Sequence, residues 1–234
     1  MICFPSTIRP THCTLDTRRA AGKRSREMIF FESETPLEWG ALDVPLLAIP
    51  HDWYGNPLDP APGYAVACDP LHLWFVAHHR APASAHPASR PGGFHAELWK
   101  HDVAELFLAD PASGRYLELN LAPNAAWWSC EFTAPRQRAE ELDIAMPDVH
   151  TWSDLAADGS WVAAMAVPLD ILQARIDFGA NTHVNVCMVL ASPAQRFLTA
   201  APLGDGGPDF HRPGHFVKPR IVPLSGMEPP TLPE

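Results

Sequence analysis

Cysteine is scarce in this sequence, and the positions of the cysteines argue against two kinds of site. Five cysteines are spread over 234 residues without a CxxC pair. Structural zinc sites and disulfide frameworks rely on closely spaced or regularly patterned cysteines. Cys68, Cys130 and Cys187 lie in apolar tracts, where a free thiol behaves as a small buried hydrophobe. We therefore expect neither zinc nor disulfides, and a reducing compartment.

Long apolar runs and positive charge are also scarce. No run approaches the roughly 18 consecutive apolar residues that a membrane-spanning helix needs. Lys and Arg number 17 against 27 Asp and Glu, so the net charge is −10. Binding to a nucleic-acid backbone depends on clustered Lys and Arg. We expect no membrane span and no nucleic-acid partner. The sequence also lacks G-x-S-x-G, P-loop and dinucleotide-binding patterns.

The N-terminal segment differs from the rest of the chain. Six Arg and Lys residues outnumber Asp16 and Glu27 there, and no apolar stretch follows them. This composition does not fit a secretory signal. We expect residues 1–27 to be disordered or a spurious extension, residues 28–226 to form one folded domain, and residues 227–234 to be a disordered tail. The expected location is cytoplasmic by default, or extracellular if the start site is misassigned.

Helical periodicity is rare, whereas period-2 alternation recurs through the main body. In Tyr116–Leu121 the three leucines point to one face, and the residues between them point to the other. Twenty-six prolines, about twice the usual share, favour short elements. One or two short helices are expected, at Pro168–Ala174 and at Gln137–Leu142. About nine short strands with turns between them predict an all-β antiparallel sandwich, immunoglobulin-like or jelly-roll. The expected strands are Tyr64–Cys68, Leu71–His79, Val103–Leu108, Tyr116–Leu121, Trp127–Phe132, Trp161–Val167, Val184–Leu190, Phe197–Ala200 and Phe216–Val222.

Four motifs follow one another in a recognisable order. They are WKHDVAELFL (99–108), YLELNLAPN (116–124), GSWVAAMAVPL (159–169) and PDFHRPGHF (208–216). Together they resemble family 9 carbohydrate-binding modules and their DOMON-like relatives. The resemblance extends from about Trp39 to Leu224. It implies a non-catalytic sandwich that binds sugars, contains structural calcium and is associated with polysaccharide catabolism.

The resemblance also implies which residues bind the sugar. In that family, a Trp ahead of the acidic strand and an aromatic residue in the last loop hold the sugar between them. The matching positions here are Trp99 and Phe210. Glu105, six residues after the Trp, is implied to bond to sugar hydroxyls. The sequence departs from the family in two ways: the second aromatic is Phe rather than Trp, and Glu118 occupies the position of a basic residue.

The chemistry of these side chains suits a mono- or oligosaccharide. The C–H face of a pyranose packs onto an aromatic ring, and a carboxylate accepts hydrogen bonds from hydroxyls. His211 adds a donor in the same loop as Phe210. A purely structural role stays open, with Trp99 as a core aromatic and Phe210 as an anchor of its loop.

Calcium is the one cofactor that we expect. Candidate ligands are the loop carboxylates Asp110, Asp205 and Asp209. Aspartates in loops also commonly cap turns.

Two other functions stay open. A DOMON-like sandwich can hold haem, and Met165, Met188 and His183 are candidate axial ligands. Alternatively, the domain mediates protein contacts through an exposed Trp128 or Trp53. The sequence does not determine which sugar is bound or the oligomeric state.

Overall fold

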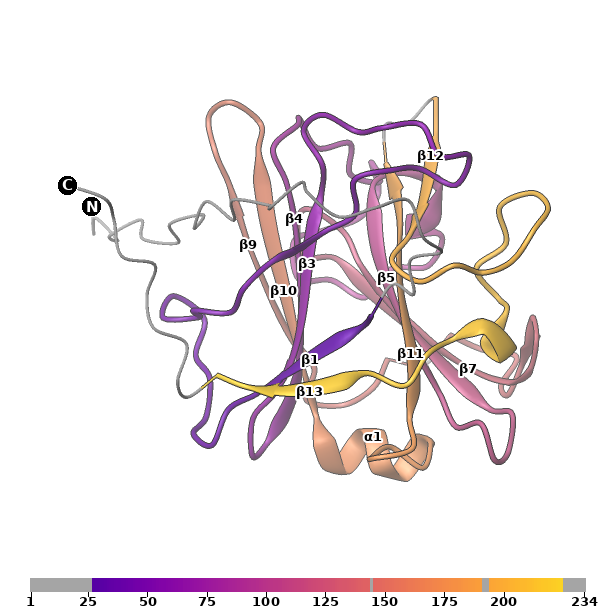
Figure 1. The fold of residues 1–234 in the computed structure, drawn as a ribbon. Helices are drawn as coiled ribbons and strands as arrows, with labels where there is room; N and C mark the ends of the chain where they lie inside the picture. The colour runs from indigo at the N-terminus through magenta and orange to yellow at the C-terminus, as the bar shows by residue number, and fades with distance from the viewer. Residues whose placement is uncertain (1–26, 144, 191–193, 225–234) are drawn as a thin grey trace.

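The computed structural model describes residues 27–143, 145–190 and 194–224. Two sheets face each other as a β-sandwich (Figure 1). The first sheet has the order β13-β1-β3-β4-β10-β9, with β2 paired to β3. Its strands are β1 (Ile29–Glu32), β2 (Leu47–Ala48), β3 (Gly63–Cys68), β4 (His72–His79), β9 (His150–Leu155), β10 (Trp161–Pro168) and β13 (Arg220–Pro223).

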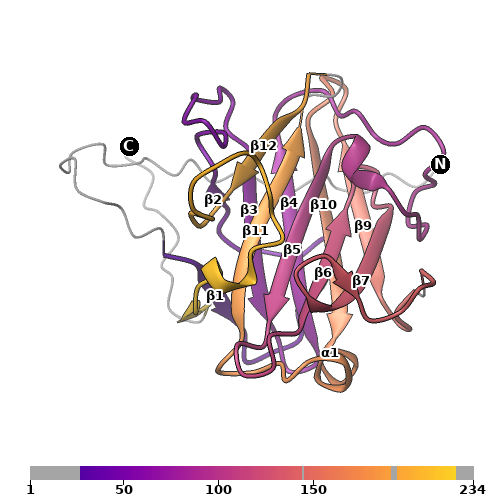
Figure 2. The same ribbon diagram turned by 90° about the vertical axis from the view of Figure 1, so that its right-hand side faces the viewer.

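The second sheet has the order β12-β11-β5-β6-β7-β8 and faces the viewer in Figure 2. The short helix α1 (Leu169–Arg175) lies at one end of the sandwich, as the sequence predicts for Pro168–Ala174. The strands of this sheet are β5 (Val103–Ala109), β6 (Tyr116–Leu121), β7 (Trp127–Ala134), β8 (Gln137–Arg138), β11 (His183–Leu190) and β12 (Arg196–Thr199).

The core lies between the two sheets and follows from the alternation. Leu106 of β5 and Leu119 of β6 are fully buried there, together with Phe75 of β4 and Met165 of β10. Trp127 belongs to this core, whereas Trp128 faces the opposite side of β7. Such a double layer, apolar on its facing sides, confirms the predicted all-β sandwich.

The outer face of the second sheet is also buried. The residues of β5 and β6 that point away from the core include Phe107 and Tyr116, both fully buried. They form a second apolar cluster with Phe210 and Phe216, which come from the long loop after β12. This loop therefore covers part of the sheet, and residues of the predicted sugar site lie beneath and beside it.

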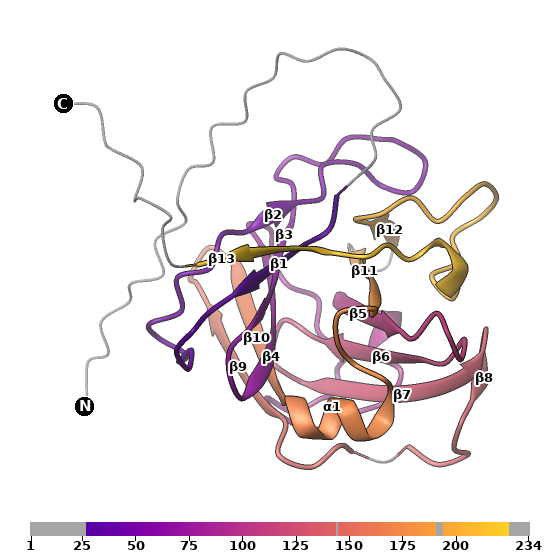
Figure 3. The same cartoon turned by 60° about the horizontal axis from the view of Figure 1, so that its bottom comes forward.

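The structure contains strands that the sequence did not predict, among them β1, β2 and β9, and it differs from the expectations in three further respects. Gln137–Leu142 does not start with a helix: residues 137–138 form β8 and pair with β7. A segment this short gains little from helix formation alone, and the pairing with β7 decides its conformation. β1 pairs in parallel with both β3 and β13, whereas the other pairs are antiparallel (Figure 3). The last strand starts at Arg220 rather than Phe216, because Val217 forms an isolated bridge with Val184 of β11 and the pairing with β1 begins only at Arg220.

The predicted ends of the domain lie mostly outside the described residues. Residues 1–26 and 225–234 include the expected extension, except Glu27, and the whole expected tail. Within the described part of the chain, no helix is both long and apolar enough to cross a membrane.

Candidate functional site

A pocket of about 310 Å³ opens on the outer face of the second sheet, beside the loop that follows β12. This volume is at the small end of the range for small-molecule sites. All five sugar-binding residues expected from the sequence line it, together with one unexpected guanidinium. These six residues are Trp99, Glu105, Glu118, Arg136, Phe210 and His211.

Glu105 and Glu118 reach the pocket from neighbouring strands. In the register of β5 and β6, Glu105 lies opposite Asn120, and Phe107 lies opposite Glu118. Both side chains therefore point to the outer face from diagonal positions of the two strands, whose Cα atoms are typically roughly 7–8 Å apart. Asn120 Nδ2 donates to Glu118 Oε1 at 3.0 Å. Glu105 is only 4% exposed, and its carboxyl accepts no hydrogen bond from another described residue.

Burial raises the pKa of both carboxyls. For Glu105, loss of hydration is the main cause and the Glu118 charge adds to it, while Arg136 opposes the change. Loss of hydration also raises the pKa of Glu118 to about 7, although the Asn120 hydrogen bond and nearby guanidinium groups lower it. The pair therefore retains a proton near neutral pH.

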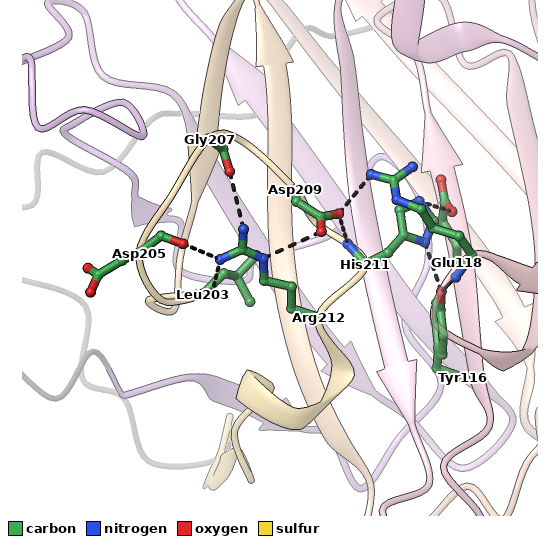
Figure 4. A network of polar contacts seen from close by, with 9 residues as sticks. Tyr116, Glu118, Leu203, Asp205, Gly207, Asp209, His211 and Arg212 are labelled. Carbon is green, nitrogen blue, oxygen red and sulfur yellow. Dashed lines mark hydrogen bonds and ion pairs between the residues drawn. The ribbon is translucent and has the colours of Figure 1, made fainter.

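His211 lies between Tyr116 and Glu118 (Figure 4). Its Nδ1 is 2.8 Å from the Tyr116 hydroxyl, and its Nε2 is 3.7 Å from Glu118 Oε2. Burial and the Arg136 charge lower the pKa of His211 to about 4, against the opposite effect of Asp209. The ring is therefore neutral at pH 7. A tautomer with the proton on Nε2 directs an N–H toward Glu118 and lets the tyrosine donate to Nδ1.

Arg136 is the site residue that the sequence analysis missed. It lies in the turn between β7 and β8 with φ 59°, a conformation uncommon for a residue other than glycine. Its backbone N–H donates to the Tyr116 hydroxyl at 3.0 Å, and its Nη2 donates to Asp209 Oδ1 at 2.7 Å. The pocket thus has a basic group, although Glu118 occupies the position where the family has one. The only sequence signal for Arg136 was its place in a turn just after a predicted strand.

Arg212 holds the loop that forms one side of the pocket. Its guanidinium donates to the carbonyl oxygens of Leu203 and Asp205 at 2.9 and 2.7 Å, and to that of Gly207 at 3.3 Å. Its Nε lies 3.5 Å from Asp209 Oδ2 (Figure 4). Because one side chain satisfies three carbonyls, the loop is pre-shaped before any ligand arrives.

We expect Arg212→Ala to loosen this loop. The variant loses hydrogen bonds to a charged donor, each contributing about 1.5–3 kcal/mol. Backbone amides of residues 203–209 should then exchange with deuterium about tenfold faster or more, as measured by mass spectrometry. Arg212→Lys should show much of the same effect, since an ammonium lacks the planar fork. Unchanged exchange in both variants, or an equal change in the control Arg220→Ala on β13, would contradict this role.

The two aromatic residues differ in exposure. Trp99 lies on a short 3₁₀ helix, Leu98–Lys100, whose Leu98 is buried, and Trp99 itself is 49% exposed at the edge of the pocket. Phe210 is only 8% exposed and packs against Trp53 and Phe197, with ring centroids 6.2 and 6.1 Å apart. Phe210 thus forms part of the wall and anchors its loop, while Trp99 provides the accessible ring.

The calcium candidates do not form one donor set. Asp110 accepts hydrogen bonds from the backbone of Ala112 and from Ser113 in the β5–β6 turn, while Asp209 pairs with two arginines. Across the described residues, no group of three or more His, Cys, Asp or Glu side chains could hold a metal ion. The three aspartates thus do not form one set of carboxylate donors, Asp205 contributes its carbonyl to the contacts with Arg212, and calcium binding stays a prediction.

The candidate residues for the two alternative functions, haem binding and protein binding, lie in different parts of the fold. Met165 and Met188 are fully buried in the core between the sheets, and His183 lies at the start of β11. Trp53 is partly buried, and its Nε1 donates to the carbonyl of Gly206 at 2.8 Å, which supports the loop rather than an exposed surface. Trp128 is partly buried as well. Haem binding and protein binding both stay predictions.

The fold is similar to that of known carbohydrate-binding proteins. No protein-family model and no curated protein sequence matches the chain. A structure from Bacteroides uniformis, of a protein proposed to bind carbohydrate, matches with a TM-score of 0.63 at 16% identity, over 84% of this chain and 100% of that one. A family 9 carbohydrate-binding module from Caldicellulosiruptor kristjanssonii in complex with glucose matches with a TM-score of 0.56 at 13% identity, over 87% of this chain and 100% of that one. The complex of a family 9 module from the same organism with cellotriose matches with a TM-score of 0.56 at 12% identity, over 88% of this chain and 100% of that one. The resemblance seen in the sequence is thus confirmed for the fold.

Proposed function

We propose that this chain is a non-catalytic carbohydrate-binding domain that takes the end of a saccharide in the pocket beside Trp99. The observation that carries the proposal is the convergence of residues far apart in the sequence. Trp99, Glu105 and His211 come from a 3₁₀ helix, a strand and a distant loop, yet they line one pocket. The similarity of the fold to modules solved with glucose and cellotriose supports the same role.

The chemistry of the pocket divides into an apolar and a polar part. The exposed indole of Trp99 offers a flat surface for the C–H face of a sugar ring. Glu105, Glu118 and the Nε2–H of His211 offer acceptors and a donor for hydroxyls. In this arrangement Phe210 contributes the wall and not a second open stacking face, so one ring carries most of the apolar contact.

Calorimetry with glucose, cellobiose, xylobiose and maltose tests the proposal. We expect heat from at least one of these sugars, with a stoichiometry near one, because the described pocket suits a single sugar end. The same sugars incubated with the protein should remain uncleaved. Absence of heat with these four sugars, and with the amino sugars named in the next subsection, at millimolar concentration would reject carbohydrate binding, and release of shorter sugars would reject the non-catalytic assignment.

A further inference from the structure

Among the described residues, no Lys or Arg forms an ion pair with either buried carboxyl of the pocket. Glu105 and Glu118 are each 4% exposed, and the only hydrogen bond among the described residues that reaches either carboxyl comes from Asn120. A buried carboxylate without a partner is costly, and it either takes up a proton or attracts a cation. Sugar hydroxyls are neutral, so a pair that binds them keeps its proton, whereas a cationic group of a ligand can take the place of that proton.

The basic groups near the pocket are already engaged. Arg136 donates to Asp209, and its side chain is 63% exposed, so solvent weakens its effect on the buried pair. Arg138, on β8, forms an ion pair with Asp143. The pocket lining itself holds three acidic side chains, Glu105, Glu118 and Asp209, against the single guanidinium of Arg136.

The remaining titratable groups around the pair carry no positive charge at neutral pH. His211 is neutral because burial lowers its pKa to about 4. Burial raises the pKa of Tyr116 on β6 to about 12, and it also raises the pKa of the thiols Cys130 on β7 and Cys187 on β11. None of these four side chains can therefore supply a positive charge to the Glu105–Glu118 pair at neutral pH, and a cation would have to come from the ligand.

We propose that the preferred ligand of this pocket is an amino sugar, whose ammonium group is bound by Glu105 and Glu118. An ammonium has three N–H donors, which match the acceptor positions of Glu105 and the second oxygen of Glu118. The sugar ring would then lie against Trp99. This inference rests on the proposed carbohydrate-binding function and specifies the class of its ligand.

Calorimetry at pH 6.5 with glucosamine, glucose and N-acetylglucosamine tests this inference, because acetylation removes the positive charge. We expect glucosamine to bind about tenfold tighter than glucose, and N-acetylglucosamine to lose that gain. If glucose binds as well as glucosamine or better, the amino-sugar inference fails and carbohydrate binding stands. If none of these sugars nor the neutral disaccharides bind, the proposed function itself fails.

The variant Glu105→Gln separates charge from shape. The variant should lower the affinity for glucosamine to the level of the affinity for glucose. The affinity for glucose should change less, because the amide keeps one acceptor oxygen. The control Asp154→Asn removes an exposed carboxylate on β9, in the other sheet, and should retain the preference. A Glu105→Gln protein that melts as a folded domain and still prefers glucosamine would overturn the inference.

Proton release gives a second readout. An ammonium ligand favours two ionised carboxylates, and burial raises the pKa of both, so binding at pH 6.5 should release at least one proton. Heats measured in two buffers of different ionisation enthalpy report this number directly. Glucosamine binding without proton release would contradict the assigned contacts.

Discussion

Replacing Trp99 by alanine is expected to weaken saccharide binding about tenfold or more. Trp99 is 49% exposed at the edge of the pocket. An aromatic side chain has on the order of 150–250 Å² to bury, and a sugar covering about half of the exposed part removes roughly 50 Å² from water. At about 25 cal/mol per Å², this contact contributes about 1.3 kcal/mol, or nearly a factor of ten.

The same substitution should leave the domain folded. Leu98, not Trp99, is the buried residue of the 3₁₀ helix, and Trp99 is not part of either large apolar cluster. Trp99→Phe should retain part of the affinity, since a smaller ring still stacks. The control Leu155→Ala removes an exposed apolar side chain from β9 on the other sheet. Full affinity in Trp99→Ala, or an equal loss in Leu155→Ala, would contradict the stacking role.

The fold was predictable from sequence where alternation is strong. β5, β6 and β10 have regular patterns because one face of each points into the core. β2 has two residues and β9 is mostly exposed, so neither carries a clear pattern. The parallel pairing of β1 also escaped prediction, since the periodicity of one strand does not reveal the direction of its neighbours.

The site was predictable only where side chains belong to ordered motifs. Trp99 and Glu105 occur in one motif and Phe210 in another, and all three do line one pocket. Their exposure was not predictable, because Phe210 is buried by Trp53, from a segment over 150 residues away in the sequence. Arg136 reaches the pocket through a turn and a positive φ, which leave no periodic signal.

The largest effect on stability is expected from Asp69→Ala in the turn between β3 and β4. The Asp69 carboxylate is buried and accepts four hydrogen bonds. Oδ1 accepts from the backbone of Leu71 and of His72, each at 2.7 Å, and Oδ2 accepts from the backbone of Leu37 at 2.9 Å and from Trp74 Nε1 at 2.8 Å. Truncation leaves these donors without their acceptor, at about 1–3 kcal/mol for each one that stays buried. We therefore expect the free energy of unfolding in urea to fall by about 3 kcal/mol or more. A loss below about 1 kcal/mol would show that this network is dispensable.

The contribution of Asp69 should also depend on pH with a defined sign. Although burial favours the neutral acid, the backbone hydrogen bonds and Trp74 hold the pKa of Asp69 below its ordinary value. A depressed carboxyl pKa stabilises the folded state above the unfolded-state value of about 3.9, and this stabilisation is lost as the pH falls through the folded-state value. The isosteric variant Asp69→Asn should thus be less stable than the wild type at pH 6, and the difference should shrink as the pH falls below about 4. Urea unfolding of both proteins between pH 3 and pH 7 measures this difference. A gap that stays constant across the range would mean that Asp69 acts through its shape and not through its charge.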